Sequence, residues 1–371
     1  MARSQLQLVL QQRMEMLRRI ALSKRPIMMV HCSKFKFVVI TEIPFGNSGN
    51  NMIEFTHGVW FASKLNATLV VPKWMSPILR PFNLTILHSQ HCFIEQSDYD
   101  QQKNESNSIS GSNVIEVTSE DSYFAYKLFS NSQHRGLLPP FSPLVLQELS
   151  EHFLRVYCAF WCSPNDKIVS AGNKLIAELL DNHLGYTAVH KRSMEGGCNY
   201  ELAVNTVSED FSPLEISKDV VEWKGRLHKY HPICEMPASQ TVATQLLLSR
   251  NGSKVFVAFD GRGDVSDYKK LGAVFSSVLD SFAMTSSHED GKLHERKFVD
   301  MFVAMHADLF ILNPRSTFSW EIYLIRVCLA LESVPILKEK DLYVMHPNKL
   351  VELKRPLWVS WLSVVDAYFS L

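Results

Sequence analysis

Apolar and polar positions follow one another along the chain in segments that predict strands and helices in turn. Residues 35–43 form a β-rich apolar run that predicts a buried strand, and the stretch after it contains helix- and strand-breaking Pro and Gly. Over residues 52–62, apolar side chains recur every three or four positions, which predicts a helix; the run 68–71 predicts a second strand. This order is a βαβ unit, so we expect a parallel sheet.

The second half of the chain repeats this alternation. The predicted elements are helices at 143–162 and 167–182, a strand at 186–190, a helix at 239–249, a strand at 254–259, a helix at 297–306, a strand at 308–312 and a helix at 318–331. The polar stretch 97–113 predicts a mobile surface loop. Strands that alternate with helices in both halves predict an α/β protein with two doubly wound domains facing a cleft.

The start of the chain differs from the rest. Residues 1–30 predict an amphipathic helix, because their apolar positions are interspersed with arginines and include no unbroken apolar core of about 7–15 residues, as a signal peptide has. We expect a first domain at 31–175, a second at 176–345, and a closing segment at 346–371 that packs back on the first domain. No stretch approaches the roughly 18 apolar residues of a membrane helix.

Charge and composition narrow the class of partner. The 38 basic residues balance 38 acidic ones, so the chain has no overall field that attracts nucleic acid or an anionic membrane. Any anionic ligand must therefore be bound by local groups. At 46% hydrophobic residues, the chain can bury a full core.

The seven cysteines are odd in number and widely spaced, and they match no zinc-binding pattern. Cys158 and Cys162 lie in an apolar run and are predicted to be buried core residues. Cys198 and Cys234 flank a polar stretch and could pair in an oxidising compartment.

Three polar turns follow predicted strands, at residues 45–51, 190–192 and 313–319. Turns of this kind expose backbone N–H groups that suit a phosphate. Together they suggest an enzyme that holds a nucleotide-linked sugar.

The residues in these turns resemble a known family. Residues 49–55, continued by 61–74, resemble the first motif of the GDP-fucose protein O-fucosyltransferases, a Gly-Asn-Gln turn and helix followed by an Ala-Lys-x-Leu-Asn-Arg-Thr-Leu run. His190-Lys191-Arg192 resembles the His-x-Arg motif of that family, and residues 300–319 resemble its donor-binding segment. The resemblance spans residues 35 to 331. The chain departs from the family at Lys191 inside His-x-Arg, at Asn51 in place of Gln and at Leu312 in place of Gly.

The resemblance implies a fold of the GT-B type, with two Rossmann-like domains and GDP-fucose bound mainly by the C-terminal one. It also implies transfer that inverts the anomeric carbon, with a hydroxyl of a protein or glycan as acceptor and with neither a divalent metal nor another cofactor. Members of the family work in the endoplasmic reticulum or Golgi lumen. In a secretory protein, four Asn-x-Ser/Thr triplets would be glycan acceptors, at Asn66, Asn83, Asn104 and Asn251; about two are expected by chance.

The resemblance also assigns roles on the donor side. Arg192 maps to the arginine that stabilises negative charge on the leaving diphosphate, which a guanidinium can grip with two hydrogen bonds. His190 maps to a residue that contacts the nucleotide, and Asp300 to the residue that accepts hydrogen bonds from guanine. The alternatives are a surface ion pair for Arg192, an ordinary core histidine for His190 and a solvated acid at a helix start for Asp300.

Further donor contacts are expected around two other strand ends. Ser316, Thr317 and Phe318 would cradle the phosphates through hydroxyl and backbone N–H groups, although Ser316 or Thr317 could equally be a helix N-cap. Asp260, at the end of an apolar strand, would line the cleft.

The acceptor side is expected at the first turn. Gly49 and Asn50 map to the Gly-Asn pair near the reacting carbon, and Asn50 would orient donor and acceptor because an amide cannot remove a proton at neutral pH. Glu54 and Glu195 are the candidates for a general base, and a structural carboxylate is the alternative for each. Two other functions stay open: a non-catalytic relative that binds a nucleotide or glycan, and a transferase that uses another nucleotide sugar.

Overall fold

The computed structural model describes residues 3–22, 32–33, 36–41, 48–105, 113–123, 128, 137–138, 143–180, 185–191, 254–259, 266–270, 272–275, 291–312, 317–329, 331 and 333–335. The predicted helix at 239–249 and the closing segment at 346–371 lie outside these residues.

Four parallel strands form the first sheet. They are β1 (Phe37–Thr41), β2 (Thr68–Val71), β3 (Phe93–Glu95) and β4 (Val114–Thr118), in the spatial order β3-β2-β1-β4. The strand predicted at 68–71 is confirmed. Every residue of β2 is buried, as expected for a strand that helices cover on both faces.

Five parallel strands form the second sheet. They are β5 (Tyr186–Lys191), β6 (Lys254–Phe259), β7 (Val274–Phe275), β8 (Leu309–Leu312) and β9 (Ser333–Pro335), in the order β7-β6-β5-β8-β9. In both sheets the chain builds outward on one side and then crosses to the other, between β1 and β4 and between β5 and β8. This is the doubly wound arrangement, so the predicted pair of Rossmann-like α/β units is confirmed.

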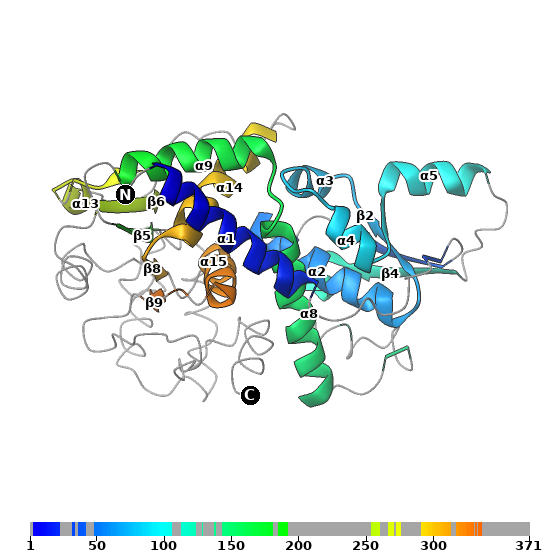
Figure 1. Ribbon diagram of the computed structural model, residues 1–371. Coiled ribbons are helices and arrows are strands. Elements are labelled where there is room, and N and C mark those ends of the chain that lie inside the picture. Colours follow the sequence, from blue (N-terminus) through cyan, green and yellow to red (C-terminus); the bar gives the residue numbers. More distant parts are fainter. Residues whose placement is uncertain are drawn as a thin grey trace, which may run out of the picture.

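The described helices are α1 (Arg3–Ala21), α2 (Ser48–Lys64), α3 (Ser76–Leu79), α4 (Thr85–Gln90), α5 (Gln96–Glu105), α6 (Ser119–Tyr123), α8 (Pro143–Trp161), α9 (Asp166–Leu179), α13 (Ser266–Lys270), α14 (Gly291–His306) and α15 (Thr317–Cys328). Figure 1 shows the two sheets on opposite sides of the molecule, with α1, α8 and α15 between them. Helix α8 packs against α1, α2 and α15, and it therefore links the two halves.

Local chemistry fixes where several helices begin and end. Helix α2 ends at Lys64. Two residues later Asn66 has φ 49°, and the N–H of Ala67 donates to the carbonyl of Ala62 at 2.9 Å, as in a Schellman C-cap. Helix α9 starts after Asn165, whose side chain accepts a hydrogen bond from the N–H of Ile168 at 3.0 Å.

Arg326 on α15 closes the C-terminal end of α14. Its side chain is fully buried, and Nη1 donates to the carbonyl oxygens of Met305 at 3.1 Å and Ala307 at 2.6 Å, while Nη2 donates to that of Asp308 at 3.2 Å. The last carbonyls of a helix lack partners within the helix, and a cation there also meets the negative end of its dipole. Arg326 thus fixes α15 against the end of α14, immediately before β8.

Within the segment 1–30 that was predicted as an amphipathic helix, residues Arg3–Ala21 form α1, and this helix is part of the core. Leu10, Leu17 and Ala21 are buried, and Nη1 of Arg13 donates to the carbonyl oxygen of His306 at 2.8 Å. The hydrogen bond attaches α1 to the end of α14.

The prediction of a loop over 97–113 is wrong for its described part. Residues 96–105 form α5, and residues 106–112 lie outside the described residues. Helix α5 is polar except at Tyr99, whose ring contacts Phe37 edge to face at a centroid distance of 5.0 Å. With one buried residue, the segment has no periodic apolar stripe from which a helix could be predicted.

Other predicted boundaries shift by a few residues. The helix expected at 297–306 begins at Gly291, and the helix expected at 318–331 ends at Cys328. Helix α9 ends at Leu179 instead of 182.

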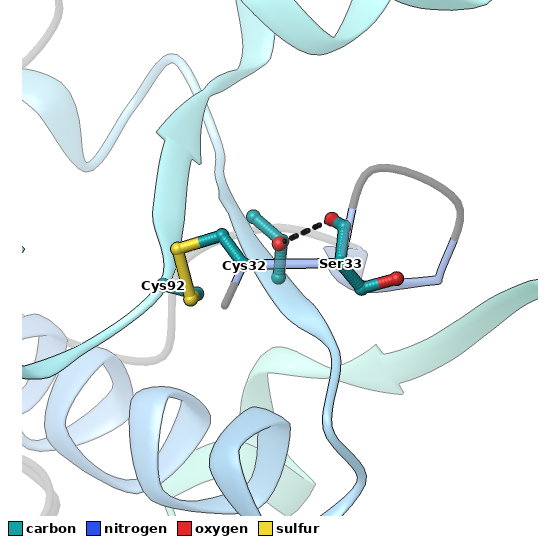
Figure 2. The surroundings of a disulfide bond; sticks show 4 residues. Cys32, Ser33 and Cys92 are labelled. Atoms are coloured by element: carbon teal, nitrogen blue, oxygen red, sulfur yellow. Dashed lines mark hydrogen bonds between the residues drawn. A yellow bond between two sulfur atoms is a disulfide. The ribbon is translucent and has the colours of Figure 1, made fainter. Parts of the chain in front are cut away.

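A disulfide joins Cys32, which precedes β1, to Cys92 at the start of β3 (Figure 2), with Cα atoms 5.1 Å apart. Next to it, Oγ1 of Thr68 donates to the carbonyl oxygen of Ser33 at 2.7 Å. The sequence analysis did not foresee this pair, because the β1-β2-β3 order brings together residues 60 positions apart. The pairing suggested for Cys198 and Cys234 lies outside the described residues. Cys158 is fully buried, as predicted, and Cys162 is half-buried.

Candidate functional site

Both sheets carry polar side chains at the point where the chain switches direction. In the first sheet, α2 follows β1 and α6 follows β4; in the second, α15 follows β8, which pairs with β5. In doubly wound folds, ligands bind outside the carboxyl ends of the strands at such switch points. Two groups of residues lie there, one for each sheet.

The first group centres on Glu54, a fully buried residue on α2. Its Oε1 accepts a hydrogen bond from Nδ2 of Asn51 at 3.2 Å, and its Oε2 accepts one from Oγ of Ser119 at 2.7 Å. Oγ of Ser122 donates to the backbone carbonyl of Glu54 at 2.7 Å. Hydrogen bonds to both carboxylate oxygens hold this group in one orientation, and they tie the first turns of α2 to the α6 segment after β4.

Asn50 and Gly49 lie in the first turn of α2, next to this group. Asn50 is half-buried, and the structure therefore places it at the edge of the carboxylate cluster. Helix N-termini expose backbone N–H groups, so the turn is suited to an electron-rich ligand oxygen.

Two buried histidines contact backbone carbonyl groups of α2 and α6. Nδ1 of His57 lies 2.9 Å from the carbonyl oxygen of Ser122, and Nε2 of His152 lies 3.1 Å from that of Thr56. The rings of His91 and His152 meet edge to face at 5.0 Å. Burial lowers the pKa of His91 to about 4 and that of His152 well below the usual histidine value, so both rings are neutral at physiological pH.

The second group centres on His190, near the end of β5. Its Nδ1 lies 2.6 Å from Oγ of Ser319, and its ring packs against that of Phe318 at a centroid distance of 4.5 Å. All three side chains are buried. Because Phe318 and Ser319 lie in the first turn of α15, the end of β5 and the start of α15 form one polar and aromatic corner.

Helix α14 borders this corner. Nζ of Lys297 lies 5.6 Å from the ring centroid of Phe318, and Asp300, one turn further along the helix, is 5% exposed. Lys191, which follows His190, places its Nζ 4.9 Å from the ring centroid of Phe259 at the end of β6. Because successive strand residues point to opposite faces, Lys191 lies on the other side of the sheet from His190. The corner itself therefore combines the Lys297 cation and an aromatic ring with the nearby buried carboxyl group of Asp300.

The structure brings together only some of the residues predicted from the sequence. His190 and Phe318 are in contact, and Glu54 and Asn50 share the first two turns of α2. Four predicted site residues lie outside the described residues, namely Arg192, Glu195, Asp260 and Ser316. Thr317 is the first residue of α15, and its side chain is not described.

The sequence analysis missed several residues of these groups, among them Ser319, Ser119 and Lys297. Ser319 lies in the segment 300–319 that resembles the donor-binding motif, but it was given no role, although its hydroxyl, seven positions after the strand end at Leu312, was the available signal. Ser119 and Lys297 gave no signal, because each reaches its group through the packing of separate elements.

Two negative findings apply to the described part of the chain. It holds no group of three or more His, Cys, Asp or Glu side chains placed to bind a metal ion. None of its helices is long and apolar enough to cross a lipid bilayer.

Comparison with known proteins agrees with this arrangement. The profile of the GDP-fucose protein O-fucosyltransferase family matches residues 39–327, which include both groups. The chain belongs to this family, and it is therefore a glycosyltransferase of the fucosyltransferase class. No curated protein sequence matches the chain.

Solved structures resemble the chain at low sequence identity. The crystal structure of POFUT1 without ligand is 16% identical, with a TM-score of 0.46, and the match covers 82% of this chain and 98% of that one. POFUT1 in complex with GDP-fucose is 16% identical, with a TM-score of 0.44 and coverage of 80% and 96%. The fucosyltransferase NodZ from Bradyrhizobium is 11% identical, with a TM-score of 0.44 and coverage of 85% and 99%.

Proposed function

We propose that the protein transfers fucose from GDP-fucose to a hydroxyl group of a protein or glycan. The observation that carries the proposal is the family match over residues 39–327, within which polar groups occupy the switch points of both sheets. The first sheet would belong to an acceptor-side domain at 31–175 and the second to a nucleotide-sugar domain at 176–345.

The donor would bind at the corner around His190. The contacts of His190 with Ser319 and Phe318 would fix the orientation of its imidazole for contact with the nucleotide. Asp300 would accept hydrogen bonds from guanine, which presents two adjacent N–H donors. Asp300→Ala should therefore weaken the preference for guanine over other bases.

Arg192 would receive the charge that grows on the diphosphate as the bond to fucose breaks. In the sequence it directly follows Lys191, the last residue of β5 at the carboxyl edge of the second sheet. Together with Asp260 at the end of β6, and with Ser316 and Thr317 at the start of α15, it would surround the phosphates. We propose that this guanidinium replaces a divalent metal, because a fixed cation aimed at developing charge needs no reorganisation.

The acceptor would meet the donor above the start of α2. Asn50 would orient the hydroxyl and the sugar, with the N–H groups of the Gly49 turn close by. If a protein side chain removes the hydroxyl proton, Glu54 and Glu195 are the two candidates for that base. Each oxygen of Glu54 already accepts one hydrogen bond and the side chain is fully buried, so to act as a base Glu54 would have to present a remaining lone pair to the acceptor hydroxyl.

We place the reaction in the lumen of the secretory pathway. The Cys32–Cys92 disulfide supports an oxidising compartment. The Asn-x-Ser/Thr triplets are consistent with the same location.

A donor screen followed by a release assay tests the proposal. Thermal shift with a panel of nucleotide sugars should give the largest stabilisation with GDP-fucose, because a ligand that binds only the folded state raises its melting temperature. Radiolabelled GDP-fucose should then release or transfer fucose. Thermal stabilisation by GDP-fucose without release of fucose would identify a non-catalytic binding protein. A larger shift in melting temperature with another nucleotide sugar would identify that sugar as the donor instead.

A further inference from the structure

Two cysteines from distant parts of the sequence meet where the two halves of the chain pack. Cys158 lies on α8, and Cys328 is the last residue of α15. Their Sγ atoms are 2.8 Å apart, at a sequence separation of 170 residues. Both are thiols in this structure.

We propose that Cys158 and Cys328 form a disulfide that covalently joins α8 to α15. Sulfur atoms in a disulfide are about 2.05 Å apart, so the two atoms need to approach by only about 0.8 Å from their present positions. The helices α8 and α15 already pack against each other, and the nearby hydrogen bond from Tyr157 to Glu321 joins the same two helices.

Within the part of the chain that the structure describes, Cys162 is a third free cysteine near this pair, and its contacts are with other atoms. Its Sγ donates to the carbonyl oxygen of Ala159 at 3.3 Å and lies 3.4 Å from Oγ of Ser163. It is also four residues from Cys158 on the same helix, whereas Cys328 faces Cys158 from the partner helix. The geometry therefore selects Cys328 as the partner of Cys158.

The bond can form by exchange with a small-molecule disulfide such as oxidised glutathione. The thiolate of Cys328, the more exposed of the two residues, attacks one sulfur of the oxidant and releases one thiol. Cys158 then loses its proton and attacks Sγ of Cys328, which releases the second thiol. Two protein thiols are oxidised to one disulfide, and the oxidant is reduced to two thiols that take up the two protons.

The burial of Cys158 affects the rate of the second step. Burial raises the pKa of the Cys158 thiol, so the attacking thiolate is scarce at neutral pH. The cross-link should therefore form slowly, and faster as the pH rises. The Cys32–Cys92 disulfide supports a compartment in which an oxidant is present.

The cross-link would restrain the helix that carries part of the candidate site. Phe318 and Ser319 lie in the first turn of α15, while α8 packs against α2, the helix of Glu54. A disulfide that closes a loop of 170 residues restricts the unfolded chain strongly. The oxidised protein should therefore melt at a higher temperature than the reduced one. The inference needs the oxidising compartment of the proposed function but not its donor.

Peptide mapping of the full chain tests the proposal. The protein is incubated in glutathione buffers of increasing oxidised fraction, its free thiols are blocked with N-ethylmaleimide, and proteolytic fragments are identified by mass spectrometry without reduction. A fragment that links Cys158 to Cys328 should appear and increase with the oxidised fraction. Cys162→Ser, the matched control on the same helix, should keep it, and Cys328→Ser should lose it.

The wild-type map decides the question even if a variant fails to fold. If both cysteines are fully blocked in buffers that keep the Cys32–Cys92 pair oxidised, the proposal is overturned. A bond from Cys158 to Cys162, or from Cys328 to any other cysteine, would overturn it too. GDP affinity measured on the same samples keeps the two proposals separate, because the linked fragment can appear whether or not GDP binds.

Discussion

The hydroxyl of Tyr157 on α8 donates a hydrogen bond to Oε1 of Glu321 on α15, at 3.0 Å, and both side chains are fully buried. Burial raises the pKa of Glu321 to about 7, and this rise is partly opposed by the positive charge of Lys297 and by the Tyr157 hydrogen bond. A carboxyl group between the two halves of the protein is thus poised to change its charge near neutral pH.

The first prediction concerns this carboxyl group. The pKa of Glu321 is raised in the folded state, so its protonated form contributes stability below about pH 4.5, and that stability is lost as the pH rises to about 7. Glu321→Gln removes the titration and should gain, relative to wild type, on the order of 3 kcal/mol between pH 4.5 and pH 7.5. Urea unfolding at both pH values measures the difference. Glu178→Gln, an exposed change on α9, should give no such gain.

His91 should have the opposite effect. Burial lowers its pKa from 6.5 to about 4, so the stability associated with its neutral ring is present above pH 6.5 and is lost as the pH falls toward 4. His91→Gln should flatten this part of the stability profile. Because the windows of His91 and Glu321 overlap and their signs differ, the wild-type curve alone can look flat. The difference in the free energy of unfolding between wild type and each variant, plotted against pH, separates the two effects. If the pH profiles of wild type and His91→Gln are parallel, the prediction for His91 is refuted.

The contact between α9 and α14 predicts a steric effect. A Cβ atom on Gly172 would lie 2.4 Å from Cδ1 of Phe302, a buried side chain. Gly172→Ala should therefore destabilise the protein by about 2 kcal/mol, in spite of the higher helix propensity of alanine. In a Phe302→Leu background, Gly172→Ala should lower the free energy of unfolding by less than it does in the wild-type background. Ser170→Ala, exposed on the same helix, serves as the control, and an equal effect of both alanines would exclude the clash.

Ser319 is predicted to position His190 for the nucleotide. Removing its hydroxyl leaves a buried imidazole nitrogen without this partner, so Ser319→Ala should weaken GDP binding by about fivefold, or about 1 kcal/mol. Ser63→Ala is the control. It likewise removes a serine hydroxyl from a helix, but this hydroxyl donates to the backbone carbonyl of Trp60, and GDP affinity should stay unchanged. Equal GDP affinities for wild type and Ser319→Ala would show that the contact is only structural.

The sequence predicts the elements whose side chains are patterned by the core. The strand at 254–259 is found with the same boundaries, because five of its six residues are buried and a covered parallel strand is apolar throughout. Helix α5 could not be predicted in this way, since Tyr99 is its single buried residue. The pattern of apolar positions indicates which residues are buried, so it cannot predict a helix that is exposed on most sides.

Contacts across elements are the part that the sequence leaves open. The motifs identified His190 and Phe318, whose rings are in contact in the structure. The hydrogen-bond contact between His190 and Ser319, however, depends on the direction in which α15 continues from β8, which the sequence does not show. The same holds for Cys32 and Cys92, which only the strand order brings together. Lys297 contacts Phe318 from α14, and no spacing of residues along the chain predicts this contact.

Calorimetric titration with GDP in buffer without divalent metal tests the central claim most directly. We predict binding in the micromolar range by the wild-type protein, and an affinity at least about tenfold lower for Arg192→Ala, a loss of about 1.4 kcal/mol. Arg19→Ala, which removes an exposed arginine on α1, should bind as wild type does. Absence of GDP binding in this range, or equal binding by Arg192→Ala, would contradict the account.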